Sequence, residues 1–467
     1  MSTRAIGFSD ETPARPIWAV KISDNPGIEE DEPAVLFIGN IHGNEPLGVR
    51  VVLELLEVLT EYYDTDTGIQ QLVDAFEIWI VPVLNPYGYE HSARKNGPSC
   101  GGVDLNRNFD FFWSFRGTSD VCNSEYYGPW EGSEPETQAI TDFVEEQRPV
   151  FGVTFHEGTE NIGMDGLIFR PWNRDIYLTS DSDCTAAGVP YSCCTGAGTG
   201  TCTADDIPDP PDRDRIRQIA MVLADAIAGR RTTGIRPSHS RVGPASSITK
   251  HYALTGMYDY LIEMSETKWH YGNYPHFYDE AIEDFESAEL TDLNDARELV
   301  YGYLGGITDM LRYFLFDDFP DYTYMGPGVT GQIYDCVTGD PVTARVSIME
   351  LDDLNGDLSV DDLDCDLDGD GNSDLGGDLF DFQSSEPLFG RYMRLTPDGT
   401  SPQSWILDID SGEHIPVLAT LSVDDDDPAD VELTEFNVAL DSGADSDGDG
   451  LTDCEEILLG TDPADDD

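Results

Sequence analysis

A histidine and a glutamate three residues apart, His42 and Glu45, stand in the segment GNIHGNEPLG, directly after a short apolar run. Two side chains at this spacing, on a turn that enters a helix, can face one point, and imidazole with carboxylate suits Zn²⁺. A second apolar run, VFGVTFH, ends in His156. Three such ligands leave one coordination position for water, as a catalytic zinc site requires. An isolated HxxE pair is more often a structural histidine beside a solvated glutamate, so the surrounding elements must decide.

Those elements alternate between apolar runs and amphipathic helical segments. The predicted strands are 17–22, 34–40, 76–85 and 150–156. The predicted helices are 46–62, 134–148, 212–229 and 290–315. Ser133 with Glu136 is typical of a capping box at the start of the second helix. The alternation predicts an α/β fold with a mixed, largely parallel sheet flanked by helices, whose ligands bind beyond the carboxyl ends of the strands.

After Pro320 the helical signal stops and strands separated by Gly, Asp and Pro turns take over. The predicted strands lie within 329–351, 389–395, 404–409 and 431–440. They favour a small β-sandwich interrupted by an acidic insert at 352–382. We therefore expect three parts, bounded as 1–318, 319–440 and 441–467.

Charge composition excludes one class of partner. The chain has 25 Lys and Arg against 92 Asp and Glu, a formal net charge of −67. Such a polyanion repels nucleic acid and anionic membranes, so phosphate-binding functions are excluded. Residues 319–467 carry a large share of the excess, with 39 acidic and 3 basic residues. A salty medium, which screens self-repulsion, and calcium loops, which use Asp at alternating positions, are both consistent with this bias.

Nine cysteines occur without any CxxC pair, which argues against a thiolate zinc site. Four of them crowd the stretch 184–202, and Cys100 and Cys122 flank another loop region. Surface-loop disulfides in an oxidising compartment are the better interpretation. The sequence has neither a long uncharged apolar run nor the apolar core of a signal peptide. We expect a secreted or cell-surface protein with no transmembrane segment, whose signal peptide lies outside this sequence.

Ordered motifs over about 260 residues resemble the zinc carboxypeptidases of the M14 family, especially the subgroup with a C-terminal transthyretin-like domain. The motifs are at 6–27, 41–48, 81–90, 102–109, 127–137, 155–158 and 258–265. The resemblance implies a metallocarboxypeptidase-like catalytic domain at 1–318 that binds one Zn²⁺ through His42, Glu45 and His156. It also implies a transthyretin-like domain at 319–440, which brings no catalytic residues of its own.

The resemblance assigns further roles on matching positions. Glu263, in LIEMS, matches the general acid/base, and Arg94, in HSARKN, matches the arginine that stabilises the oxyanion. Asn106 and Arg107, in DLNRNF, match the pair that binds the free α-carboxylate of the substrate. Asp104 matches a carboxylate that orients the first zinc histidine.

One position departs from the family pattern. A tyrosine that closes over the substrate is usual 22 residues before the catalytic glutamate, and here that position is Arg241. Arg241 could contact the substrate instead, or Tyr252 or Tyr258 could approach. We expect retained activity, because the zinc ligands and Glu263 are intact.

The family's side-chain pocket falls on small or apolar residues, which are Gly243, Ser246, Ile248 and Leu261. This composition favours a neutral or apolar C-terminal residue of the substrate over Lys or Arg. The anionic field of the whole chain opposes this preference by attracting cationic peptides.

The segment DSDGDGLTDCEE has the spacing of an EF-hand calcium loop and resembles a thrombospondin type 3 repeat. Its expected ligands are Asp445, Asp447, Asp449, Leu451, Asp453 and Glu456. A solvated acidic tail is the alternative, and flanking EF-hand helices are not predicted. A weaker Ca²⁺ candidate has Gly377 in place of the final acid. Its expected ligands are Asp366, Asp368, Asp370 and Asp374.

Together these features predict a zinc metallocarboxypeptidase that removes single residues from the C-termini of peptides or proteins through activated water. An amidase-like member of the same fold, acting on cell-wall peptides or amino-acid conjugates, stays open. So does a non-catalytic, calcium-stabilised surface adhesion module on a dead carboxypeptidase scaffold. Intact Glu263 and Arg94 favour the enzyme.

Overall fold

The computed structural model describes residues 1–157 almost continuously, without positions 29, 31, 112, 115 and 116. Beyond them it describes 167–171, parts of 216–227, 238–241, 246–264, 303–311 without 309, 328–350, 383–384, 391–395, 403–423, 433–447, 451–459 and 463. All structural statements below concern these residues.

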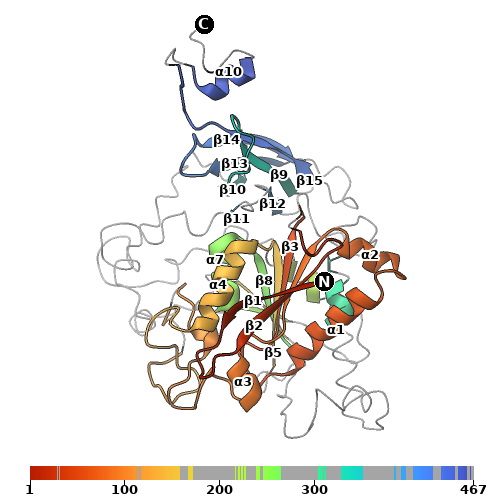
Figure 1. The fold of residues 1–467 in the computed structure, drawn as a ribbon, viewed down its shortest axis with the longest axis vertical. Helices are drawn as coiled ribbons and strands as arrows, with labels where there is room; N and C mark the ends of the chain where they lie inside the picture. Colours follow the sequence, from red (N-terminus) through yellow and green to blue (C-terminus); the bar gives the residue numbers. More distant parts are fainter. Residues whose placement is uncertain are drawn as a thin grey trace.

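One eight-stranded mixed sheet organises the N-terminal part (Figure 1). Its strands are β1 (Ser2–Phe8), β2 (Pro16–Ile22), β3 (Ala34–Ile38), β4 (Glu77–Val81), β5 (Phe151–His156), β6 (Leu167–Arg170), β7 (Ser238–Arg241) and β8 (Tyr258–Glu263). The spatial order is β1-β2-β4-β3-β5-β8-β6-β7. The central run β4-β3-β5-β8 is parallel, and antiparallel pairs flank it. The predicted mixed, largely parallel sheet is confirmed.

Helices cover both faces of this sheet, as Figure 1 shows for α1 and α4. The described helices of the region are α1 (Leu47–Glu61), α2 (Thr67–Val73), α3 (Pro86–His91), the 3₁₀ turn η1 (Leu105–Arg107), α4 (Pro135–Gln147) and α7 (Ser247–Thr255). Successive side chains of β3 point to opposite faces of the sheet and pack against different helices. Phe37 packs in the cluster that contains Leu55 of α1, whereas Leu36 packs in the cluster that contains Phe143 of α4. Each buried side chain of this size contributes roughly 1.5–3 kcal/mol.

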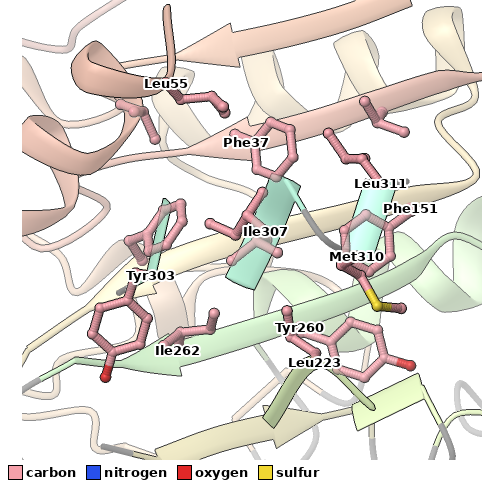
Figure 2. Close-up of a cluster of buried hydrophobic side chains, with 14 of the residues drawn as sticks. Phe37, Leu55, Phe151, Leu223, Tyr260, Ile262, Tyr303, Ile307, Met310 and Leu311 are labelled. Atoms are coloured by element: carbon pink, nitrogen blue, oxygen red, sulfur yellow. The ribbon is translucent and has the colours of Figure 1, made fainter. Parts of the chain in front are cut away.

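The described residues of the predicted helices 212–229 and 290–315 are helical. Their buried side chains join the α1 layer, and Figure 2 shows Ile307 and Leu223 gathered in one cluster with Phe37 and Tyr260. The remaining residues of both predictions lie outside the described part of the chain. This cluster fixes the position of β8 from one face.

The predicted capping box at Ser133 is wrong. Helix α4 begins at Pro135, its N-cap is Glu134, and no side chain caps it. Ser133 Oγ instead accepts a hydrogen bond from Asn108 Nδ2 at 2.9 Å and donates to Glu134 Oε1 at 2.7 Å. The hydroxyl is therefore engaged by a loop distant in sequence, which the local pattern could not indicate.

The C-terminal part contains two four-stranded sheets. Their strands are β9 (Gly328–Asp335), β10 (Arg345–Glu350), β11 (Gln383–Ser384), β12 (Arg391–Leu395), β13 (Gln403–Asp410), β14 (Val417–Val423), β15 (Leu433–Glu435) and β16 (Val438–Leu440). One sheet has the order β11-β10-β13-β14, and in the other β9 pairs with β12, β15 and β16. Val329 and Ile333 of β9 share an apolar cluster with Val346 and Leu407 of the first sheet. Strands β9, β10, β12, β13, β15 and β16 overlap the predicted ranges, whereas β14 was not predicted. The β-sandwich and the transthyretin-like relationship stay predictions.

A disulfide joins Cys336, directly after β9, to Cys454 in α10 (Asp453–Leu459). The expectation that no helix flanks the acidic loop is wrong on its C-terminal side, because α10 begins inside the motif. A second disulfide, Cys100–Cys122, confirms that these two cysteines close a surface loop. The cysteines at 184–202 lie outside the described residues.

Within the described part of the chain, no helix combines the length and apolar character needed to cross a membrane.

Candidate functional site

His42, Glu45 and His156 meet at the carboxyl ends of β3 and β5, and we call them the His–Glu–His cluster. His42 Nδ1 lies 3.1 Å from each carboxylate oxygen of Glu45. His156 Nδ1 lies 2.9 Å from Glu45 Oε2 and 3.1 Å from His42 Nδ1. All three side chains are buried, and one ligand atom from each lies within 4.8 Å of the others. The structure thus brings together the three residues that the sequence predicted.

The loop after β3 is shaped by local backbone features. Asn40 adopts a left-handed conformation at φ 57°, and its Nδ2 donates to the carbonyls of His42 and Glu45 at 3.1 and 3.2 Å. Gly43 packs against α3 so closely that a Cβ would lie 1.8 Å from the carbonyl carbon of Gly88. Only glycine fits at position 43, because any side chain would displace the loop from the helix.

Asp104 lies behind His42. His42 Nε2 donates to Asp104 Oδ1 at 3.0 Å, since an ionised carboxylate only accepts. Burial alone would raise the pKa of Asp104, but the charge of Arg94 and the hydrogen bond from His42 hold that pKa well below its usual range. The proton on Nε2 leaves the Nδ1 lone pair of His42 directed into the cluster.

The donor set fits Zn²⁺. Burial lowers the pKa of His156 to about 4, so its imidazole is neutral at neutral pH and offers a lone pair. Two imidazoles and one carboxylate converging in a buried space form the three-ligand set of catalytic zinc sites. Without a cation, the packing of these acceptor atoms would be unfavourable, so the residues present fit the metal.

Arg94 borders the cluster. Its Nε and Nη2 donate to Asp104 Oδ2 at 2.9 and 2.7 Å, and its Nη1 lies 3.1 Å from His42 Nδ1. Asn85 fixes the backbone nearby, because its Nδ2 donates to the carbonyls of Ile41 and Arg94 at 3.2 and 3.3 Å. The guanidinium is therefore preorganised beside the His–Glu–His cluster.

Asn106 and Arg107 lie in η1, whose N-cap is Asp104. Asn106 Oδ1 accepts the backbone N–H of Ser247 at 3.0 Å, which links η1 to the start of α7. Arg107 Nη2 donates to Glu125 Oε1 at 3.2 Å, and its Nη1 donates to the carbonyl of Asn106 at 2.9 Å. The amide and the guanidinium are thus held at one edge of the site.

Glu263 is the last residue of β8, and its register partner on the parallel strand β5 is His156. Side chains of laterally paired residues point to the same face of a sheet. Glu263 is half-buried, whereas the rest of β8 is buried. The register therefore sets a half-buried glutamate beside the His–Glu–His cluster.

A family model described as zinc carboxypeptidase matches residues 2–285. The chain belongs to the zinc carboxypeptidase family. A second family model, described as a bacterial TSP3 repeat, matches residues 445–465.

Three similar proteins give the extent of the likeness. Carboxypeptidase SOL1 from Arabidopsis thaliana is 36% identical over 154 residues, which are 32% of this chain and 28% of that protein. A zinc carboxypeptidase from Saccharothrix mutabilis subsp. capreolus is 41% identical over 110 residues, 21% of this chain and 25% of that protein. The chain thus spans about a quarter of the length of these curated relatives. A solved carboxypeptidase A from Helicoverpa armigera has 19% identity and a TM-score of 0.48, covering 67% of this chain and 68% of that one.

The pocket positions expected from the family are only partly described. Ile248 of α7 and Leu261 of β8 form a small buried apolar cluster, and Phe169 of β6 packs against it. The sequence analysis did not predict Phe169 as a pocket residue. The short apolar run that contains Phe169, downstream of His156, could have indicated it. Ser246 is buried at the N-cap of α7, and Gly243 lies outside the described residues.

Arg241 ends β7, where its backbone pairs with Arg170 of β6, and its side chain is outside the described part. The suggestion that Tyr252 or Tyr258 replaces the family's tyrosine is wrong. Both rings are buried in the apolar cluster behind the sheet, with centroids 6.5 Å apart. Neither ring can close over a substrate without leaving the core.

The acidic loop is described at Asp445, Asp447, Leu451, Asp453 and Glu456, whereas Asp449 lies outside the described residues. Asp453 begins α10, and its carboxylate accepts from the N–H and the Oγ of Ser446, both at 2.7 Å. The second calcium candidate, 366–374, lies entirely outside the described residues. Both calcium assignments stay predictions.

Proposed function

We propose that the protein is a zinc carboxypeptidase that hydrolyses the C-terminal peptide bond of peptides or proteins. The observation that carries the proposal is the meeting of His42, Glu45 and His156 with Glu263 in lateral register beside them. Membership of the zinc carboxypeptidase family supports the same conclusion. When bound by this cluster, Zn²⁺ would polarise the scissile carbonyl and acidify a water molecule.

The proton transfers fall to Glu263. Its carboxylate takes a proton from the attacking water and delivers it to the nitrogen of the leaving amine, which departs as a neutral amino group. The end of a strand suits this role, because pairing with β5 fixes the backbone while the side chain is only half-buried.

Arg94 stabilises the negative charge that develops on the carbonyl oxygen. Its guanidinium is fixed by two hydrogen bonds to Asp104, so little reorganisation is needed during the reaction. A preorganised donor of this kind typically contributes about 10²- to 10³-fold in rate.

Asn106 and Arg107 restrict cleavage to the chain end. Because Asn106 Oδ1 is occupied by the Ser247 N–H, the amide Nδ2 is the end that remains for a substrate carboxylate. The Arg107 guanidinium adds positive charge at the same edge. A peptide with an amidated C-terminus offers no carboxylate to this pair and is therefore excluded as a substrate.

The apolar character of Ile248, Leu261 and Phe169 supports a preference for neutral or apolar C-terminal residues. For position 241, we propose that the arginine contacts the substrate in place of the family's tyrosine. The acidic tail is proposed to bind structural Ca²⁺, and the two disulfides support a secreted or cell-surface location.

Mass-spectrometric analysis of a peptide library tests the proposal. We expect loss of single residues from free C-termini, no cleavage of amidated peptides, and loss of activity on removal of zinc with a chelator. Cleavage confined to cell-wall peptides or amino-acid conjugates would favour the amidase-like alternative. A zinc-loaded protein that leaves the whole panel intact would favour the adhesion module.

A further inference from the structure

A buried polar pair, His251 and Asp259, lies between α7 and β8, outside the groups to which the proposed reaction assigns roles. His251 Nδ1 lies 2.6 Å from Asp259 Oδ2, and neither residue has exposed surface. This is the distance of a short hydrogen bond. A buried pair of this kind is weak evidence for stability, because desolvation offsets the attraction, and its best-attested use is to fix register between elements.

The interior is shaped to hold the pair. Asp259 is the register partner of Gly152 on β5, and a Cβ at Gly152 would lie 3.2 Å from Asp259 Oδ1 and 1.9 Å from Met257 Cε. Among the described residues, neither Asp259 Oδ1 nor His251 Nε2 has a hydrogen-bond partner. Within the described part of the chain, the bond from Nδ1 to Oδ2 is therefore the side-chain hydrogen bond that the pair makes between α7 and β8.

His251 also contacts the segment that carries the proposed carboxylate-binding residues. Its ring meets the ring of Phe109 edge to face, with centroids 5.8 Å apart and an interplanar angle of 86°. Phe109 follows Asn106 by three residues and lies two residues after the end of η1. His251 thus touches β8 on one side and the η1 segment on the other.

The first turn of α7 makes two further contacts to the site. Ser247 and Ile248 precede His251 by four and three residues, a spacing that puts all three side chains on one face of a helix. The Ser247 N–H donates to Asn106 Oδ1 at 3.0 Å, and Ile248 packs against Leu261 of β8. A rotation or slide of α7 would disturb both contacts at once.

We propose that His251 and Asp259 are positioning residues for substrate binding, which hold α7 in register on β8 and thereby orient Asn106 and Ile248 toward the C-terminal residue of the substrate. The inference rests on the proposed function, because it concerns the binding of a substrate carboxylate. The pair touches neither substrate nor metal ligands, so its effect falls on KM more than on kcat.

Two substitutions at one position test the inference. The amide nitrogen of Asn occupies roughly the place of Nδ1, whereas that of Gln occupies roughly the place of Nε2, so His251→Asn keeps the bond to Asp259 and His251→Gln loses it. The KM and kcat for an N-acyl dipeptide with an apolar C-terminal residue are measured on zinc-loaded enzyme. We expect H251Q to raise KM about tenfold with kcat within about threefold, and H251N to stay close to wild type.

A matched control lies on the same helix. Thr255→Val removes the hydrogen bond from Thr255 Oγ1 to the carbonyl of His251, 3.2 Å long, on a buried residue farther from η1. It tests whether destabilising α7 alone raises KM. An H251Q enzyme whose thermal midpoint falls like that of T255V while its KM stays at the wild-type value would overturn the inference. Asp259→Asn, which keeps an acceptor but removes its charge, replaces H251Q if that variant does not fold.

Calorimetric binding of an N-acyl amino acid with a free carboxylate separates the two proposals. Weaker binding by H251Q than by wild type supports the positioning role even if the wild type cleaves no peptide, in which case the proposed function fails alone. Equal binding by wild type, H251Q and H251N overturns the positioning role even if peptides are cleaved normally.

Discussion

The His–Glu–His cluster and the acidic loop at 445–456 are two candidate metal sites built in opposite ways. The first joins ligands that are 114 residues apart, His42 and His156, in the buried end of a sheet. The second takes all its expected ligands from twelve consecutive residues, of which Asp445 is exposed while Asp453 and Glu456 are buried. The first site depends on strand pairing for its geometry, and the second depends mainly on local spacing.

The comparison also concerns carboxylates. Asp104 is completely buried yet keeps its charge, because Arg94 and His42 face it. Glu136 is completely buried as well, but its donors are the neutral groups Asn96 Nδ2 and the Asp10 N–H, each at 3.1 Å. Burial there raises the pKa to about 7. Asp104 and Glu136 are thus equally buried, and the charged partner Arg94 is what separates the ionised carboxylate from the one with a raised pKa.

The largest effect is expected at Glu263. Glu263→Gln keeps the shape of the side chain but cannot accept and return a proton, so kcat falls by roughly 10³- to 10⁴-fold. Zinc content, measured by metal analysis, stays at the wild-type level. Glu57→Gln, on the exposed face of α1, is the matched control and leaves kcat unchanged. An active E263Q enzyme would contradict the assignment of the general acid/base.

The next largest effect concerns pH and Glu136. Its folded pKa of about 7 lies above the ordinary value of 4.5. Its contribution to stability is therefore fully present below about pH 4.5 and is lost as the pH rises through 7. Glu136→Gln stays neutral at every pH and should remove up to about 3 kcal/mol of this dependence.

Urea unfolding of the two proteins between pH 4.5 and 7.5 checks this expectation. Glu145→Gln, on the exposed face of the same helix, is the control and should keep the wild-type pH profile. If the free energy of unfolding depended on pH in the same way for wild type and E136Q, a cation would have to compensate the charge of Glu136. The contrast with Asp104 would then be removed.

A smaller effect is expected on metal affinity at Asp104. Asp104→Asn removes the charge that faces His42 and Arg94, and zinc binding should weaken by about 10- to 100-fold. Competition with a chromophoric chelator measures the affinity. Asp110→Asn is the control, because its half-exposed carboxylate pairs with Lys250 at 2.8 Å. If both variants bound zinc equally well, the orientation of His42 would not depend on Asp104.

The smallest effect is expected in the acidic loop. At a Ca²⁺ concentration about ten times the dissociation constant, binding stabilises the folded form by about 1.4 kcal/mol. The thermal midpoint of the C-terminal part should rise with Ca²⁺ in the wild type and not in Glu456→Gln. Glu413→Gln, an exposed change outside the loop, keeps the response. Zinc-dependent hydrolysis should be the same in all three proteins, because the two sites are separate.

The sequence by itself determined the parts that depend on local pattern. Apolar runs predicted the strands β2, β3, β4 and β5, and apolar residues at helical spacing predicted α1. The position of His42 and His156 at or after the ends of two predicted strands indicated them as candidate site residues. These features are local because burial and helix periodicity act over neighbouring residues. The ordered motifs added Glu263, Arg94 and Asn106 through resemblance.

Only the tertiary structure decided which distant groups meet. The register of β5 on β8 pairs His156 with Glu263, and packing behind the sheet buries Tyr252 and Tyr258 away from any substrate. The contact between His251 and Asp259 has no sequence signature, because His251 lies outside the matched motifs and the meeting of the two residues depends on how a helix packs on a strand. Such contacts are set by the whole core, whose close packing selects one arrangement among many that the local patterns allow.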